Sequence, residues 1–173
     1  RVKLFAGITV SVLSALILLT AEMVTAFALY GFDGYAATFQ VFLPATMFSL
    51  TIGQASIILM LLLLAVSAFL SVLAMCLSQL TRNRSAASSL MIVVMFLSMI
   101  TPPSSLRVIS LLWGMMPGAF CGAWAFYDYH LIGIGGHYLN CLQYTPLCYL
   151  LLGGALAYLT GRAYAKSEIQ NKG

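Results

Sequence analysis

The first apolar stretch of the chain carries four polar side chains that share one side of a helix. Ser11, Ser14, Glu22 and Thr25 fall within about 80° of one another at 100° per residue. Ionisable side chains inside a membrane usually face a bundle interior, a partner or a water-filled path. The stripe therefore predicts a substrate path or a helix contact. The alternative is that Glu22 is neutral or hydrogen-bonded to a neighbouring helix and only orients packing.

Small residues recur at helical spacing in two further stretches and predict close helix packing. Small side chains let helix backbones approach one another closely inside a membrane. The two predicted packing seams consist of Ser67, Ser71, Ala74 and Ser78, and of Gly153, Ala157 and Gly161. Each seam joins helices either of one chain or of two chains.

The sequence contains no standard catalytic or metal-binding motif. The phosphate-binding loop G-x-x-x-x-G-K-[ST] is missing, so the chain is not expected to bind ATP itself. The glycine-rich residues 133–136 are expected to form a flexible turn. The spacing of Asp128, His130 and His137 fits no usual zinc site, so no metal is predicted. We expect neither an enzyme nor a cofactor bound to this chain.

The four cysteines do not form a C-x-x-C pair. Cys121 and Cys141 both fall in a predicted outer segment, where a disulfide between them is chemically permitted. Cys76 and Cys148 are expected to be ordinary core residues.

The composition identifies the class of protein in which these residues must be positioned. Of the 173 residues, 62% are hydrophobic and 7% are charged, and the mean hydropathy is +1.00. A soluble domain is about one quarter charged. The chain is therefore predicted to be a polytopic membrane protein. A soluble enzyme, a nucleic-acid-binding protein and a disordered chain are excluded, despite a pI near 9.0.

Four apolar runs are predicted to cross the membrane as an all-α helix bundle within a single transmembrane domain, residues 1–173. A spanning helix needs roughly 20 mostly apolar residues. The predicted spans cover residues 4–30, 52–80, 85–101 and 142–164. The remaining residues form outer segments at 31–51 and 102–141 and a cytoplasmic tail at 165–173.

Residues 106–126 are also apolar enough to cross, but they are broken by glycines and a proline. The positive-inside rule favours four spans, because a fifth would move the basic C-terminal tail outside. We therefore predict that residues 102–141 form an outer re-entrant or interfacial segment, and that both ends of the chain are cytoplasmic. Residues 35–49 are predicted to be an amphipathic segment or a short structured loop. Four spans place these cations inside: Arg1, Lys3, Arg82, Arg84, Arg162, Lys166 and Lys172.

Several motifs occur in an order that is typical of one transporter family. The sequence FSLTIGQ at 48–54 leads into a leucine-rich run, and SQLTRNRSAA at 78–87 forms a small basic turn. A proline-marked outer region and a final span follow, ending in GRAYAK at 161–166. This order resembles the C-terminal part of a type-two ABC transporter permease, the membrane subunit of many bacterial exporters.

The resemblance implies a subunit of an ATP-driven exporter in a bacterial cytoplasmic membrane. A second permease subunit, identical or different, would complete the translocation path within the lipid bilayer. A separate ABC ATP-binding subunit would bind ATP and Mg and hydrolyse the ATP. Family members have six spans, so these four would correspond to spans three to six of a longer chain. The outer segment would match the family's re-entrant helices.

Two other functions remain open from the sequence. The first is an ion-coupled transporter in which Glu22 exchanges protons. The second is an accessory membrane subunit that transports nothing itself. The sequence identifies neither the substrate nor, apart from the resemblance, the direction of transport.

Overall fold

The computed structural model describes residues 2–100, 105–120, 122–127 and 131–170. Three of the described helices are long and apolar enough to cross a membrane, which indicates a membrane-embedded protein. The helices are α1 (Val2–Tyr30), α2 (Ile52–Thr81), α3 (Arg84–Ser98), α4 (Arg107–Gly114) and α5 (Cys141–Gln170). Shorter elements are the 3-10 helices η1 (Phe39–Val41), η2 (Pro117–Phe120) and η3 (Ala123–Tyr127), and the strands β1 (Ile132–Ile134) and β2 (His137–Leu139).

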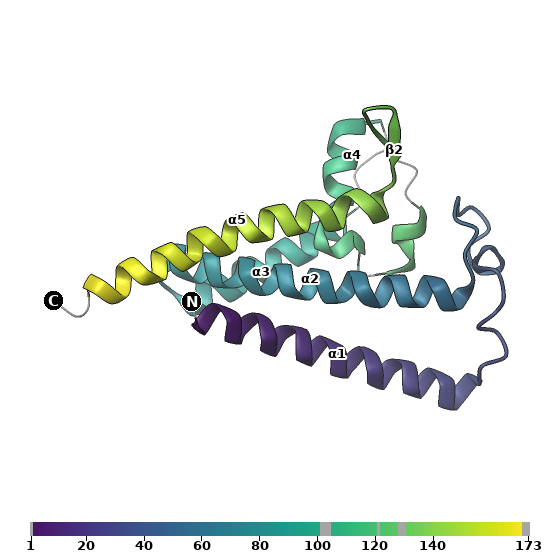
Figure 1. Ribbon diagram of the computed structural model, residues 1–173, viewed down its shortest axis with the longest axis horizontal. Coiled ribbons are helices and arrows are strands. Elements are labelled where there is room, and N and C mark those ends of the chain that lie inside the picture. Colours follow the sequence, from purple (N-terminus) through teal and green to yellow (C-terminus); the bar gives the residue numbers. More distant parts are fainter. Residues whose placement is uncertain (1, 101–104, 121, 128–130, 171–173) are drawn as a thin grey trace.

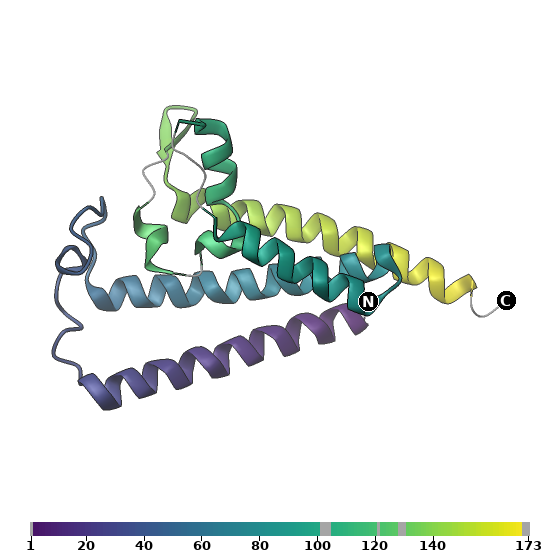
Figure 2. The ribbon, with the colours of Figure 1, turned by 180° about the vertical axis from the view of Figure 1, so that it is seen from behind.

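Helix α2 lies at the centre of the structure (Figure 1). Helix α1 runs antiparallel along one side of α2, and α3 and α5 pack on the other side, as both views show (Figures 1 and 2). We call the end at which α2 and α5 begin the hairpin end, because β1 and β2 lie there. The opposite end, where α1 begins and α2 ends, we call the basic end.

Reciprocal caps define where α2 and α5 begin. The Gln54 amide N–H donates to Thr51 Oγ1 at 3.2 Å, and the Thr51 N–H donates to Gln54 Oε1 at 3.1 Å. Asn140 and Gln143 repeat the arrangement at the start of α5, at 3.1 and 3.3 Å. Each cap satisfies backbone donors that a helix start otherwise leaves unpaired.

The helix boundaries depart from the predicted spans at two places. Helix α3 ends at Ser98 instead of 101, because the chain tightens there through a bond from the Met99 N–H to the Phe96 carbonyl at 3.2 Å. Its 15 residues measure about 22 Å, less than the roughly 30 Å of a hydrocarbon core. Helix α5 continues through Gln170, whereas a tail was predicted from residue 165. Residues 165–170 contain no glycine or proline, so nothing in them stops a helix.

A two-stranded hairpin is the one described departure from an all-α fold. Strands β1 and β2 pair antiparallel, with Ile134 opposite His137. Gly135 and Gly136 join them with φ values of 58° and 87°. Two consecutive residues with positive φ suit a tight hairpin turn, and glycine adopts that conformation without a steric penalty. The glycine-rich stretch predicted as a flexible turn is therefore an ordered hairpin.

Buried side chains connect the two predicted outer segments to each other and to α2. Phe126 of η3 is 1% exposed, and its ring lies 4.9 Å from that of Phe39 and 5.8 Å from that of Phe48. The Thr46 hydroxyl donates to the Phe126 carbonyl at 3.1 Å. Residues 35–49 were predicted to be an amphipathic segment or a short structured loop, and the structure shows a loop that contains η1.

A second cluster joins the middle of α2 to α5 and to the segment between α3 and α5. Leu62, Val66, Ala125 and Tyr149 share this buried cluster, and Met115 packs against it. The Tyr149 ring stacks on Phe69 of α2 with centroids 4.7 Å apart, and its hydroxyl donates to the Met115 carbonyl at 2.6 Å.

Replacing Tyr149 with phenylalanine is expected to lower the free energy of unfolding by about 1–2 kcal/mol. The substitution keeps the ring but leaves the Met115 carbonyl without this donor. Titration with sodium dodecyl sulfate in mixed micelles, followed by circular dichroism, measures the change. Tyr158→Phe is the control, because Tyr158 is exposed on the same helix. Equal stability of the two variants would show that the Tyr149 hydrogen bond contributes nothing.

Candidate functional site

The polar stripe of α1 meets the serine seam of α2 at a single point. Ser11 and Ser67 lie with their hydroxyl oxygens 2.9 Å apart. Each hydroxyl also lies within hydrogen-bond distance of the other residue's backbone carbonyl, at 3.2 and 3.1 Å. A Cβ added to Gly7 would lie 3.0 Å from the Met75 sulfur, so the helices approach closely here. The structure thus places the α2 seam against α1 of the same chain.

The rest of the predicted stripe does not contact α2. Ser14, Glu22 and Thr25 are exposed, and the Thr25 hydroxyl donates to the Ala21 carbonyl of its own helix at 2.7 Å. The α1 residues that face α2 form a row of half-buried residues spaced four apart. Each step of four residues turns slightly around the helix, so this row diverges from the polar stripe. That row consists of Ser11, Ala15, Leu19, Met23 and Phe27.

Glu22 is the one acidic residue within the three apolar segments long enough to cross a membrane, Val2–Tyr30, Ile52–Thr81 and Cys141–Tyr164. Its side chain is exposed, and it has no hydrogen-bond or ion-pair partner among the described residues. The structure therefore does not support the alternative in which Glu22 bonds to a neighbouring helix of this chain. An ionised side chain at the centre of a bilayer costs about 2.5–3.5 kcal/mol, so water or a partner is needed beside it.

Removing both Ser11 and Ser67 hydroxyls tests whether they couple α1 to α2. A double-mutant cycle of Ser11→Ala and Ser67→Ala is expected to give a coupling energy of about 0.6 kcal/mol. The free energy of unfolding in micelles is measured for the wild type, both single variants and the double variant. The same cycle with Ser14→Ala in place of Ser11→Ala is the control. A coupling energy of zero for the Ser11 cycle would contradict the contact.

The α5 seam faces α2 at one of its three positions. Gly153 is buried, and a Cβ added there would lie 3.4 Å from the Phe69 ring. Gly161 has open space where its Cβ would be, and Ala157 is half-buried. Close packing of α5 on α2 is therefore concentrated near Gly153, where the Tyr149 ring also stacks.

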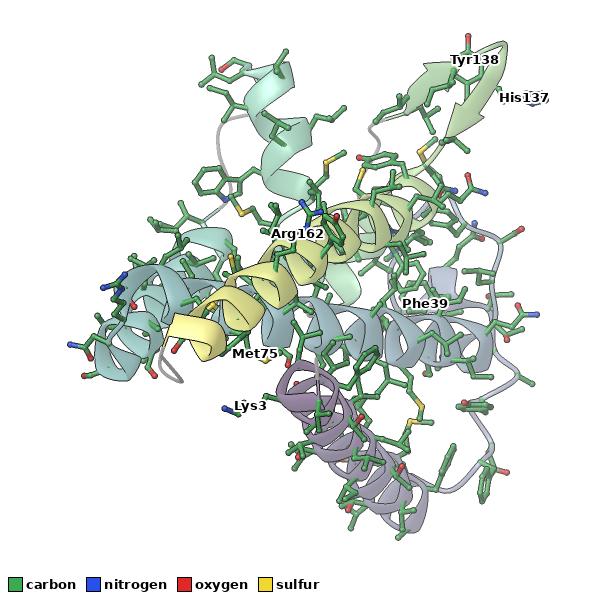
Figure 3. The ribbon with its side chains drawn as sticks, turned by 60° about the vertical axis from the view of Figure 1, so that its left-hand side comes forward. Lys3, Phe39, Met75, His137, Tyr138 and Arg162 are labelled. Carbon is green, nitrogen blue, oxygen red and sulfur yellow. The ribbon has the colours of Figure 1, made fainter. Side chains whose placement is uncertain are left out.

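The structure describes some, but not all, of the residues considered for a disulfide or a metal site. The sulfur of Cys141 is buried 3.4 Å from the Ala125 carbonyl oxygen, and Cys121 lies outside the described residues. Their pairing stays a prediction. His137 is exposed on β2 and points away from the bundle (Figure 3), whereas Asp128 and His130 lie outside the described residues.

Sequence reasoning missed a cleft at the basic end. Its volume is about 380 Å³, and it is lined by Lys3, Ser78, Gln79, Arg82 and Tyr164 from α1, α2 and α5. We call it the basic cleft. The two cations indicated only membrane orientation in the sequence, and their placement at one cleft depends on α1 lying antiparallel to α2. Figure 3 shows Lys3 at the start of α1, near the part of α2 that carries Met75.

Arg82 caps the end of α2 in an uncommon backbone conformation. Its φ of 51° and ψ of 16° lie in the left-handed region. Glycine is common at this position of a helix end, and a side chain there costs about 1 kcal/mol. The conformation ends α2 and directs the chain toward α3, whose first turn is capped by Asn83.

The described residues thus offer three features that could act in function: the uncovered face of α1 with Glu22, the segment packed against the middle of α2, and the basic cleft. Within the described ranges, no group of three His, Cys, Asp or Glu side chains is placed to hold a metal ion. No family model, curated protein or solved structure matches this chain.

Proposed function

We propose that this chain is a membrane-spanning permease subunit of an ATP-driven ABC exporter. The observation that carries the proposal is the order of its elements along the bundle. Two long antiparallel helices are followed by a short helix, by an irregular segment that packs deep against α2, and by a last long helix. This is the order that the resemblance to type-two permeases predicts.

The depth of the irregular segment supports a re-entrant arrangement. Helix α2 has 30 residues and is about 45 Å long, so a hydrocarbon core of roughly 30 Å leaves about 7 Å at each end. Leu62 and Val66 lie about 15 and 21 Å from the start of α2. Ala125 belongs to the same buried cluster as Leu62 and Val66, and Met115 packs against that cluster. With α2 centred in the membrane, these residues would lie about 8–14 Å inside the hydrocarbon edge. Protein covers this non-helical backbone, as membrane depth requires.

The proposal includes four crossings, the third of which would use α3. Helix α3 is too short to cross alone, but its end at Ser98 accepts a hydrogen bond from the Gly118 N–H of η2 at 3.0 Å. The segment that begins at η2 would occupy the remaining thickness beside α3. In this arrangement the basic end faces the cytoplasm of a bacterial cell, as the positive-inside rule requires.

The uncovered face of α1 supports a second permease subunit. Only Leu4 is buried in α1, whereas Ser14, Glu22 and Thr25 are all exposed. Lipid would cover the apolar side chains, but it would leave the carboxyl group without a partner. A second subunit against this face would enclose Glu22 in a polar path between the two subunits.

The ATP-binding subunit would act from the basic end. Hydrolysis can drive transport only if ATP favours one packing of the helices over the other. The contact between α1 and α2 suits such a change, because Leu4 is the one buried residue of α1 and few buried side chains must repack. The ATP and Mg would bind to the partner, which leaves this chain to form the path.

The Glu22→Gln variant distinguishes an ATP-driven exporter from an ion-coupled transporter. In complexes purified with the accompanying ATP-binding protein, we expect the variant to keep more than half of the wild-type ATP hydrolysis rate. Glutamine keeps the size and hydrogen bonding of the side chain and removes only its charge. The exposed, unpartnered position of Glu22 is the specific observation that favours the alternative.

Vanadate-sensitive ATP hydrolysis and proton movement are measured in the same proteoliposomes, with Thr25→Ala as the control variant. An ion-coupled transporter would instead show no ATP hydrolysis and would lose proton movement in Glu22→Gln. That pair of results would overturn the proposal.

A further inference from the structure

The basic cleft has the composition of a site for a phosphate group. All five lining side chains carry hydrogen-bond donors, and Lys3 and Arg82 add two positive charges. None of the described side chains that line the cleft is a carboxylate. Arginine and lysine form strong charge-assisted hydrogen bonds with phosphate oxygens, and arginine can do so with two donors at once.

The backbone of Arg82 places its guanidinium group at this cleft despite a conformational cost. The residue adopts a left-handed conformation with φ of 51°, which a glycine would adopt without strain. Lys3 approaches from the first turn of α1, and Tyr164 approaches from α5. The cations therefore converge from separate helices instead of lying along one solvated helix face.

Apolar side chains near the start of α1 and the end of α2 are exposed, as lipid contact requires. Val2 is 83% exposed and Phe5 67% exposed on α1, and Leu80 is 75% exposed on α2. Val2 precedes Lys3 and Leu80 lies two residues before Arg82, so exposed apolar side chains are present at the same end of the bundle as the cleft. A free phosphate ion would use the cations only, whereas a phospholipid would use both.

We infer that the basic cleft binds the phosphate of an anionic phospholipid from the cytoplasmic leaflet. Lys3 and Arg82 pair with the phosphate, while Ser78, Gln79 and Tyr164 supply further donors. Val2 and Leu80 provide exposed apolar surface for the acyl chains at the same end of the bundle. Basic pockets between membrane helices on the cytoplasmic side are suited to anionic headgroups. The inference rests on the proposed placement of the basic end at the cytoplasmic surface.

Lipid retention by the full-length protein tests this inference. The protein is reconstituted in phosphatidylcholine vesicles containing one-fifth phosphatidylglycerol and extracted in mild detergent, and the bound phosphatidylglycerol is counted by native mass spectrometry. Each cation near an anionic surface contributes about fivefold in affinity, so Lys3→Gln with Arg82→Gln is expected to weaken retention about 25-fold. The charge-preserving pair Lys3→Arg and Arg82→Lys should stay within a few-fold of wild type.

Arg162→Gln is the control and is compared with Arg82→Gln alone, because each removes one positive charge from the basic end. Arg162 is exposed and lies over the Tyr158 ring at 4.8 Å, outside the cleft (Figure 3). Retention that falls equally in Arg162→Gln and in Arg82→Gln would overturn the inference. Displacement of the lipid by millimolar inorganic phosphate would identify free phosphate as the ligand and would also overturn it. Co-purification of an ATP-binding partner is measured in a separate experiment. Loss of lipid retention therefore tests this inference, and absence of the partner tests the proposed function.

Discussion

Replacing Phe126 with alanine is expected to lower the free energy of unfolding by about 3–5 kcal/mol, the largest effect predicted for this chain. The ring is 1% exposed and fills the space between Phe39, Phe48 and the start of α2. Alanine would leave a cavity there, because the surrounding rings are fixed by the loop hydrogen bonds and by α2. Denaturant titration in micelles measures the change.

Phe42→Ala is the matched control for Phe126→Ala. Phe42 belongs to the same outer loop region but is 67% exposed, so its removal is expected to change the unfolding free energy by less than about 0.5 kcal/mol. Equal destabilisation by the two substitutions would contradict the packing of η3 under the loop. It would show that the two outer segments do not form a common core.

Replacing Gly118 with alanine is expected to lower the free energy of unfolding by about 2–3 kcal/mol. An added Cβ would overlap the Ser98 hydroxyl and lie 3.1 Å from the Ser98 backbone carbonyl carbon. The Ser98 hydroxyl cannot easily move away, because it donates to the Met95 carbonyl at 2.7 Å and accepts from the Gly118 N–H. The C-terminal end of α3 would therefore have to move away from η2.

A second substitution makes this prediction specific to the contact. Adding Ser98→Ala removes the hydroxyl that the new Cβ overlaps, so the double variant should be less destabilised than the sum of the single variants. Gly154→Ala is the control, because nothing lies within 4 Å of its Cβ position and alanine favours a helix. Additive losses would contradict the contact between α3 and η2, as would a Gly118→Ala protein as stable as Gly154→Ala.

The positions of the long helices were predictable because they depend on residues close together in the sequence. A run of apolar residues sets each long helix, and caps such as Thr51 with Gln54 set where it starts. The α2 seam was also predictable, since small residues at helical spacing mark a close approach. The partner of that seam was not predictable, because spacing along one helix contains no information about which helix lies opposite.

Features that depend on distant parts of the chain were missed. Phe126 lies in the segment predicted to be re-entrant or interfacial, and its burial depends on a loop 80 residues earlier, where the Thr46 hydroxyl donates to its carbonyl. The basic cleft likewise depends on distant residues, because Lys3 lines it from α1 and Arg82 lines it from the end of α2. The stripe on α1 was predicted as one face. The α1 residues that face α2 turn gradually around the helix instead, so Glu22 lies outside the contact between α1 and α2.

The measurement that tests the proposed function most directly is the composition of the particle that contains this chain. The full-length protein is tagged, extracted from its native membrane in mild detergent, and analysed by native mass spectrometry with peptide sequencing. The account predicts two permease subunits together with a protein that carries a phosphate-binding loop. A particle that contains this chain but no ATP-binding protein, under conditions in which the purified protein remains folded, would contradict it.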